Sequence, residues 1–208
     1  YLKRTRELGL RYQATRAQAK GMSDSDWAVR RSTTGWVFML SNAAISWSSR
    51  KQDSIALSSC EAEIMALSEA AKEGIYLKGF LEELGVREPG VPFDVATDNT
   101  GARDLSYNPE HHQKVKHIER RHFFVREAVE NLQVNVPYVN TAHNLADFFT
   151  KALPPKVFEP LRNTIMNAPS DCARVSVAPP KVGSVHEGAL VSESASAPGS
   201  LRLRGGGR

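Results

Sequence analysis

The longest uninterrupted helical pattern in the chain covers residues 58–85, and it constrains the fold more than any other stretch. Apolar residues recur there at steps of three and four, which predicts an amphipathic helix with one buried stripe. The stripe consists of Leu67, Ala70, Gly74, Leu77, Leu81 and Leu84. Glu63 lies on this stripe, whereas Glu61 points roughly the other way. A buried carboxylate needs an ion pair, a hydrogen bond or a metal ion, although a lone Glu in a first helical turn is more often solvated.

Length and composition bound the class of protein. The 208 residues suffice for one domain with a buried core and some further sequence. No apolar run approaches the roughly 18 residues of a membrane helix, and no apolar signal segment opens the chain, so we expect a soluble, intracellular protein. Cys60 and Cys172 form no CxxC pair, which argues against a zinc site or a disulfide framework. The net charge of +4 is a weak indication of polyanion binding.

Strand signals stand on both sides of the long helix. Before it, residues 34–40 are aromatic and β-branched, residues 42–43 offer a turn, and residues 44–48 predict a second, antiparallel strand. After it, residues 93–97 alternate apolar and polar side chains, as a half-buried strand does, and deliver Asp98 at their end. The order of these signals predicts an α/β fold.

Three further elements are predicted towards the C-terminus. A helix over residues 114–131 has an apolar stripe formed by Val115, Ile118, His122, Val125 and Val129. Residues 134–138 alternate as a strand, and Pro137 favours the edge of a sheet. Asn140 or Thr141 then caps a short helix over residues 142–153 that contains Asp147.

Four acidic residues lie near the ends of predicted elements: Asp24 after a polar strand candidate, Glu63, Asp98 and Asp147. Carboxylates that share a site repel one another, so such a cluster is stable only with cations. Hard oxygen ligands suit Mg²⁺, and two such ions can assist phosphodiester cleavage. However, a chain with 23 acidic residues places four at element ends by chance fairly often, so spacing alone leaves the site open.

Several motifs resemble one known family, the ribonuclease H domain of the Pol polyprotein of copia-type LTR retrotransposons. They occur in the family's order, and the similarity covers residues 22–167. The matching segments are SDSDWA (23–28), RRSTTGWVFML (30–40), AISWSSRKQDSIALSSCEAEIMALSEAAKE (44–73), DNTGA (98–102), KHIERRHFFVRE (116–127) and NLADFFTKAL (144–153). The resemblance implies a ribonuclease H-like mixed sheet flanked by helices, which cuts the RNA strand of RNA/DNA hybrids.

The resemblance also implies the roles of the four acids. The first acid falls on Asp24 rather than Asp26, and the second on Glu63 rather than Glu61. Asp24 and Asp98 would hold or bridge two Mg²⁺ ions, for which Mn²⁺ can substitute; Glu63 would anchor one ion, and Asp147 would complete the other. These are the expected catalytic and metal-binding residues, and no protein nucleophile is needed.

Basic residues between positions 111 and 126 form a candidate nucleic-acid interface. Because phosphate contacts dominate nucleic-acid affinity, a basic helix beside the acids would hold the backbone across them. The preferred contacts are Lys116, His117, Arg121 and Arg126. For each charge taken singly, a solvated helix face is an equally good interpretation, and a zinc site from the histidines is less favoured.

Domain limits and a competing function complete the expectations. Residues 1–13 resemble the connection from a reverse transcriptase, which would precede this domain in a polyprotein. Residues 14–167 form the ribonuclease H-like domain, and the Ala-, Ser- and Pro-rich residues 168–208 form a disordered tail. Residues 16–22 are too polar for a typical central strand, and this favours the alternative of a catalytically degenerate fragment that retains the fold and at most binds nucleic acid.

Overall fold

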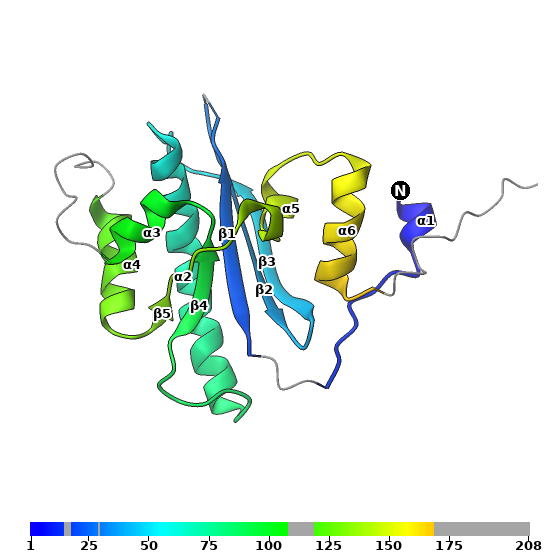
Figure 1. The fold of residues 1–208 in the computed structure, drawn as a ribbon, viewed down its shortest axis with the longest axis horizontal. Helices are drawn as coiled ribbons and strands as arrows, with labels where there is room; N and C mark the ends of the chain where they lie inside the picture. The colour runs from blue at the N-terminus through cyan, green and yellow to red at the C-terminus, as the bar shows by residue number, and fades with distance from the viewer. Residues whose placement is uncertain (15–17, 29, 108–118, 169–208) are drawn as a thin grey trace, which may run out of the picture. The chain divides into compact units, whose positions relative to one another are not determined.

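The computed structural model describes residues 1–14, 18–28, 30–107 and 119–168. Within this part of the chain, five strands form one mixed sheet in the order β3-β2-β1-β4-β5 (Figure 1). The strands are β1 (Lys20–Asp26), β2 (Thr33–Leu40), β3 (Ala43–Lys51), β4 (Phe93–Thr97) and β5 (Val134–Asn135). The first three are antiparallel neighbours, whereas β4 runs parallel to β1 and β5 parallel to β4. The prediction of an α/β fold with a mixed sheet is confirmed.

A two-residue turn joins β2 to β3. Ser41 and Asn42 have φ angles of 53° and 68°, the left-handed conformation that tight hairpin turns require. The predicted turn at residues 42–43 is therefore displaced by one residue, and β3 is longer than the predicted strand 44–48.

Helix α2 (Ser59–Glu83) begins with a reciprocal cap. The Ser58 hydroxyl accepts a hydrogen bond from the backbone N–H of Glu61 at 3.1 Å, and the Glu61 carboxylate accepts one from the N–H of Leu57 at 2.6 Å. These bonds satisfy backbone donors that the first helical turn leaves unpaired. The expectation that Glu61 points away from the fold is wrong, because its side chain folds back over the cap and is buried.

The predicted apolar stripe of α2 is buried from Leu67 to Leu81, but Leu84 is 58% exposed. Leu84 follows the last helical residue and so leaves the helical face. In the first half of α2, successive residues are buried on all sides because the helix contacts strands, α3 (Thr100–Tyr107) and α4 (Glu119–Glu130). This burial keeps the N-terminal half of α2, which carries Glu63, away from water.

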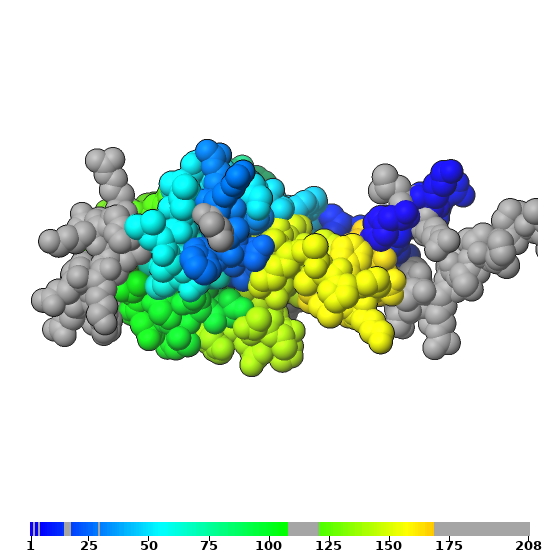
Figure 2. Space-filling view, turned by 90° about the horizontal axis from the view of Figure 1, so that it is seen from above, coloured from blue at the N-terminus to red at the C-terminus, as the bar shows by residue number. Residues whose placement is uncertain are grey.

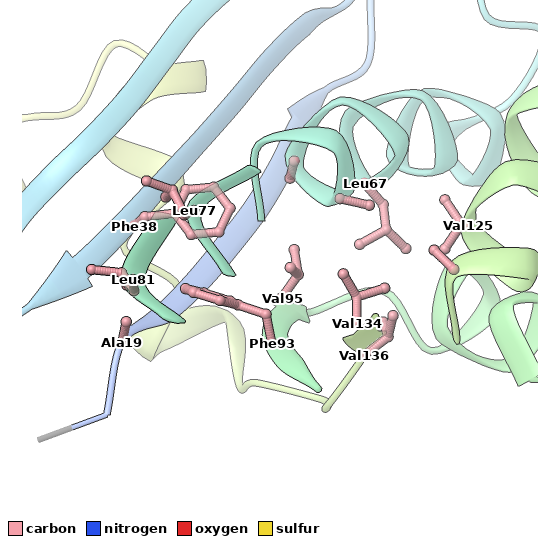
Figure 3. Close-up of a cluster of buried hydrophobic side chains, with 13 residues drawn as sticks. Ala19, Phe38, Leu67, Leu77, Leu81, Phe93, Val95, Val125, Val134 and Val136 are labelled. Carbon is pink, nitrogen blue, oxygen red and sulfur yellow. The ribbon is translucent and has the colours of Figure 1, made fainter. Parts of the chain in front are cut away.

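Helices cover both faces of the sheet (Figure 1). On one face, α2 and α4 pack on Phe38, Phe93 and Val95 from the strands, in the cluster drawn in Figure 3. On the other face, α5 (Asp147–Thr150) and α6 (Pro155–Met166) pack on a second cluster that includes Met22 and Val37. The sheet is thus a middle layer between two apolar cores.

The central strand β1 has mostly small and polar side chains, yet it pairs with β2 on one side and with β4 on the other. A methyl group added at Gly21 would lie 2.3 Å from the Phe38 ring, so the aromatic ring of β2 fills the space beside it. Asp24 lies inside β1, not after it as expected, and pairs with Gly35 of β2. The prediction that this segment is too polar for a central strand is therefore wrong, because the neighbouring elements supply the apolar side chains that β1 lacks.

The predicted helices near the C-terminus need two adjustments. The helix expected over residues 114–131 is described from Glu119 onwards, with His122 and Val125 buried as predicted; Val115 and Ile118 lie outside the described residues. The single helix expected over 142–153 is wrong. Instead, Asn140 caps a 3₁₀ turn, η2 (Thr141–His143), and α5 follows as a separate helix. Strand β5 lies at the sheet edge, as Pro137 predicted, but it covers only residues 134–135 of the expected 134–138, and Tyr138 forms an isolated bridge with Thr97.

The N-terminal residues pack against α6 and the β2–β3 hairpin, and Figure 2 shows α1 (Leu2–Thr5) beside α6. The N–H of Arg11 donates to the carbonyl of Met166 at 3.0 Å, and the Tyr12 hydroxyl donates to the carbonyl of Ala44 at 2.7 Å. The described residues cluster as one compact unit. No helix among the described residues combines the length and apolar character needed to cross a membrane.

Candidate metal centre

Three of the four predicted acids converge at one place, although they are far apart in the sequence. Asp24 comes from the middle of β1, Glu63 from the beginning of α2, and Asp98 from the end of β4. Each offers one carboxylate oxygen, and these oxygens lie within 4.8 Å of one another. Such proximity is the geometry in which carboxylates can share a divalent cation.

Asp24 is held by side chains from α5. Its Oδ2 accepts a hydrogen bond from the Thr150 hydroxyl and lies 3.4 Å from the Lys151 ammonium. Thr150 can approach this closely because the residue paired with Asp24 is Gly35, where an added methyl group would lie 2.5 Å from the Thr150 methyl carbon. Gly35 therefore sets the distance between the sheet and α5.

Glu63 is 7% exposed and has one satisfied and one unsatisfied oxygen. Its Oε1 accepts a hydrogen bond from the backbone N–H of Ser25 at 3.3 Å, which fixes the start of α2 against β1. Its Oε2 is buried and finds no hydrogen-bond partner among the described residues. A buried carboxylate oxygen without a donor is costly, and a bound cation would remove that cost. The donor set and this atom both fit a hard divalent ion.

The electrostatics of the cluster follow from burial and like charge. Burial, together with the neighbouring charge of Asp24, raises the pKa of Glu63 to about 8. Burial also raises the pKa of Asp24 to about 6, against the opposing effects of the Thr150 hydrogen bond and the Lys151 charge. Without cations the protein therefore favours partly protonated carboxylates, and cations would restore their charge.

The fourth acid, Asp147, lies beside this cluster but outside the group of three. It is the first residue of α5, and its Oδ1 lies 2.8 Å from the Lys151 ammonium. Lys151 thus contacts both Asp147 and Asp24. Burial would lower the pKa of Lys151, but the hydrogen bond to Asp147 and the attraction of Asp24 outweigh it and raise this pKa to about 12.

Sequence reasoning missed three residues that position the acids: Asn144, Thr150 and Lys151. The buried Asn144 donates from Nδ2 to the carbonyl of Ser23 at 3.1 Å and accepts from the N–H of Ala146 at 3.1 Å. It ties the segment before α5 to the strand that carries Asp24. The motif NLADFFTKAL contains all three residues, so their presence was visible, but a one-helix interpretation of that segment hid their contacts.

The predicted nucleic-acid contacts are described only in part. Lys116 and His117 lie outside the described residues. Arg121 donates to the Ser54 hydroxyl at 3.3 Å and lines a pocket with Arg50 and Lys51. Arg126 pairs with Glu130 at 3.3 Å and lies over the Phe123 ring, so its guanidinium is engaged within α4. Of the two described arginines, Arg121 is the one that lines this pocket.

Known proteins similar to this chain include large Pol polyproteins, of which the chain matches a part. The chain is 42% identical over 144 residues to the retrovirus-related Pol polyprotein from transposon TNT 1-94 of Nicotiana tabacum, a match that covers 67% of this chain and 11% of that protein. It is 37% identical over 141 residues to the corresponding polyprotein from transposon RE1 of Arabidopsis thaliana, covering 66% and 10%. The chain thus spans about a tenth of the length of these relatives.

Among solved structures, the chain is similar to ribonuclease H1 from the halophilic archaeon Halobacterium salinarum. The TM-score is 0.48 at 14% sequence identity, and the match covers 64% of this chain and 95% of that one. No family model matches the chain.

Proposed function

The chain is homologous to part of the Pol polyproteins of copia-type LTR retrotransposons, and we propose that it is a metal-dependent ribonuclease H that cleaves the RNA strand of RNA/DNA hybrids during reverse transcription. One observation carries the proposal: Asp24, Glu63 and Asp98 bring three carboxylate oxygens within 4.8 Å of one another at the sheet. A reverse transcriptase domain in the same polyprotein would be the partner that supplies the hybrid.

In the proposed mechanism the carboxylates would hold two Mg²⁺ ions, for which Mn²⁺ could substitute. Asp24, Glu63 and Asp98 would hold one ion, and Asp24 with Asp147 would complete the second position. When bound, such ions supply a water activated at neutral pH and neutralise the leaving oxygen. The protein contributes the placement: Thr150 orients Asp24, the Ser25 N–H orients Glu63, and Asn144 anchors the segment that leads to Asp147.

Substrate binding in this proposal relies on cations outside the acidic cluster. Arg121 of α4 and Arg50 and Lys51 of β3 line one pocket, so they offer positive charge from two elements to a phosphate backbone. Glu69 partly offsets this charge, because it pairs with Arg50 at 2.5 Å. Arg121 is then the described member of the predicted set best suited to contact phosphate, and Lys116 and His117 extend the same basic sequence.

The decisive experiment compares Asp98→Asn with the unchanged chain on a labelled RNA/DNA hybrid in Mg²⁺ or Mn²⁺. We expect metal-dependent cleavage by the unchanged chain and a loss of at least about a hundredfold in the variant, because one ligand of the shared ion is neutralised. Asp104→Asn is the matched control, since Asp104 is an exposed acid on α3 near Asp98 in sequence, and it should cleave normally.

The outcome that contradicts the proposal is equally specific. If the unchanged chain and both variants bind the hybrid with equal affinity and none cuts it with either metal, the chain is a degenerate fragment that retains hybrid binding alone.

A further inference from the structure

The Lys151 ammonium lies between two of the carboxylates assigned to the metal centre. It is 2.8 Å from Asp147 Oδ1 and 3.4 Å from Asp24 Oδ2. Asp24 also belongs to the group of three carboxylates with Glu63 and Asp98, whereas Asp147 does not. The four acids therefore form two unequal subsites that share Asp24: one has three carboxylates, and the other is already neutralised by a cation of the protein itself.

The position of Lys151 follows from the local structure. Asp147 is the first residue of α5, and Lys151 is its C-cap, whose backbone N–H donates to the carbonyl of Asp147 at 3.2 Å. Residues four apart on a helix lie on the same side, with the acid on the N-terminal side of the base, the favourable order. Thr150, adjacent to Lys151, is fixed by Asp24 and directs the end of α5 towards the strand.

The ammonium is not locked in place. With 36% of its side chain exposed, Lys151 can turn its long aliphatic stem towards solvent without unfolding the helix. The contrast is with Asp24 and Glu63, which are 2% and 7% exposed and held by hydrogen bonds. The subsite between Asp24 and Asp147 therefore combines a fixed Asp24 carboxylate with a removable cation.

We propose that Lys151 is a positioning residue that occupies the second cation position in the metal-poor protein, so that divalent ions bind in sequence. The first ion enters among Asp24, Glu63 and Asp98. The second enters between Asp24 and Asp147 only when the Lys151 ammonium leaves. This inference rests on the proposed function only in taking the four acids as the metal centre.

Electrostatics is the reason for the order. A divalent ion held by Asp24 and Asp147 would lie within a few ångströms of the ammonium that those carboxylates now contact, and at such distances like charges repel strongly where water is scarce. In the three-carboxylate subsite, Glu63 and Asp98 form no ion pair with another described residue, and the unpartnered Glu63 Oε2 favours occupancy. Lys151 and the second ion are thus mutually exclusive occupants.

The test is a Mn²⁺ titration of the full chain followed by electron paramagnetic resonance, which counts free ions without requiring activity. We expect two classes of site, the second weaker. Lys151→Met should tighten the second class by roughly tenfold, a usual size for coupling between competing ligands, and leave the first nearly unchanged. Asp147→Asn should remove the second class alone. Lys78→Met is the matched control, because Lys78 also forms an i,i+4 ion pair, with Glu82 at 2.7 Å, but takes no part in the acidic cluster. Both classes of site should stay unchanged in this variant.

The proposal is overturned if Lys151→Met leaves the second class unchanged or weakens it, or if the unchanged chain binds no Mn²⁺ or binds two ions with equal affinity. Lys151→Ala, checked for native circular dichroism, repeats the test without the Met side chain. Failure of the proposed function is recognised separately. If Mn²⁺ binds in two steps and Lys151→Met strengthens the second step, but the chain cleaves no hybrid under any condition, the proposed order of binding holds and the proposed nuclease activity does not.

Discussion

Glu63 combines a buried position with a carboxylate that the protein satisfies at only one oxygen. Its Oε1 has the Ser25 N–H, its Oε2 has no donor among the described residues, and Asp24 adds a like charge nearby. At the scale of single residues, therefore, the largest unfavourable contribution of the candidate centre to folding is the burial of the charged Glu63 carboxylate. This contribution depends on pH, because protonation removes the charge.

The first prediction concerns stability in metal-free buffer between pH 5 and pH 8. The pKa of Glu63 is raised from 4.5 to about 8 in the folded protein, so the folded state holds a proton that the unfolded state has lost. Stability from this group is fully present below pH 4.5 and is lost as the pH rises through about 8. The free energy of unfolding should fall over this range by an amount on the order of a few kcal/mol. Urea unfolding at several pH values measures it.

Two comparisons make this pH prediction specific. Glu63→Gln should flatten the decline because Gln has no charge to bury, while Glu83→Gln, on an exposed part of α2, should follow the unchanged chain. Mg²⁺ should restore more stability at pH 8 than at pH 5. Parallel curves for Glu63→Gln and the unchanged chain would contradict the assignment.

At the scale of elements, β1 shows how a central strand can be built from small and polar residues. Its neighbour β2 supplies Phe38, whose ring occupies the space beside Gly21, and α2 covers the same face. Near the other end of β1, Asp24 has room because it pairs with Gly35 of β2. The small side chains of β1 lower its intrinsic strand propensity, but the packing of its neighbours requires them.

A second prediction follows for Gly21→Ala. The added methyl group would lie 2.3 Å from a carbon of the Phe38 ring, so the ring or strand must shift. We expect a destabilisation of about 1–3 kcal/mol, typical of an overpacked core, measured by chemical denaturation.

Gly79→Ala is the control for that change. Gly79 lies within α2 and has no atom within 4 Å of an added methyl group, so the same substitution should stabilise the protein by about 0.5–1 kcal/mol. Adding Phe38→Leu to Gly21→Ala should recover part of the loss. If both glycine variants are equally stable, the contact with Phe38 does not limit β1.

At the scale of the whole molecule, segments from the two ends of the described part of the chain meet. The N-terminal residues bond to the end of α6 through Arg11 and to the hairpin through Tyr12. Asn167, which ends α6 in a left-handed conformation, donates from its side chain to the carbonyl of Arg11 at 2.8 Å. Whether residues 1–13 are the remnant of a polymerase connection stays a prediction, but they are packed on the rest of the fold.

A third prediction tests this packing with Tyr12→Phe. The change removes the hydroxyl that donates to the Ala44 carbonyl at 2.7 Å, and the loss of one such bond should cost about 1 kcal/mol of unfolding free energy. Tyr76→Phe, at an exposed position on α2, should change stability by less than about 0.5 kcal/mol in the same denaturation series. Equal effects would mean that the N-terminal segment does not dock.

A fourth prediction concerns the hybrid, which would extend beyond any one element. Arg121→Ala should weaken hybrid binding, and the slope of log affinity against log salt concentration should fall by about 1, because one phosphate contact is lost. Fluorescence anisotropy at several salt concentrations measures both. Lys156→Ala removes an exposed charge from α6 and is the control. An unchanged salt slope for Arg121→Ala would exclude Arg121 from the phosphate contacts.

The sequence by itself determined the elements whose patterns are local. The apolar steps of α2, the alternation in β4 and the aromatic residues of β2 each reflect which side of an element faces the core, and that information repeats every few residues. The same periodicity placed Glu63 on the buried face. It failed at Glu61, where a helix cap rather than the stripe decides burial, and over residues 142–153, where Asn144 breaks the helix by bonding to a distant strand.

Only the tertiary structure decided how the acids relate to their surroundings. The distances among Asp24, Glu63 and Asp98, the hydrogen bond from Thr150, and the position of Lys151 between two carboxylates all join segments far apart along the chain. Such contacts depend on where strands and helices are brought by packing, including the close approach that Gly35 allows. The physical reason is that local periodicity records which face of an element is buried, whereas the partner met at that face is set by the complete fold.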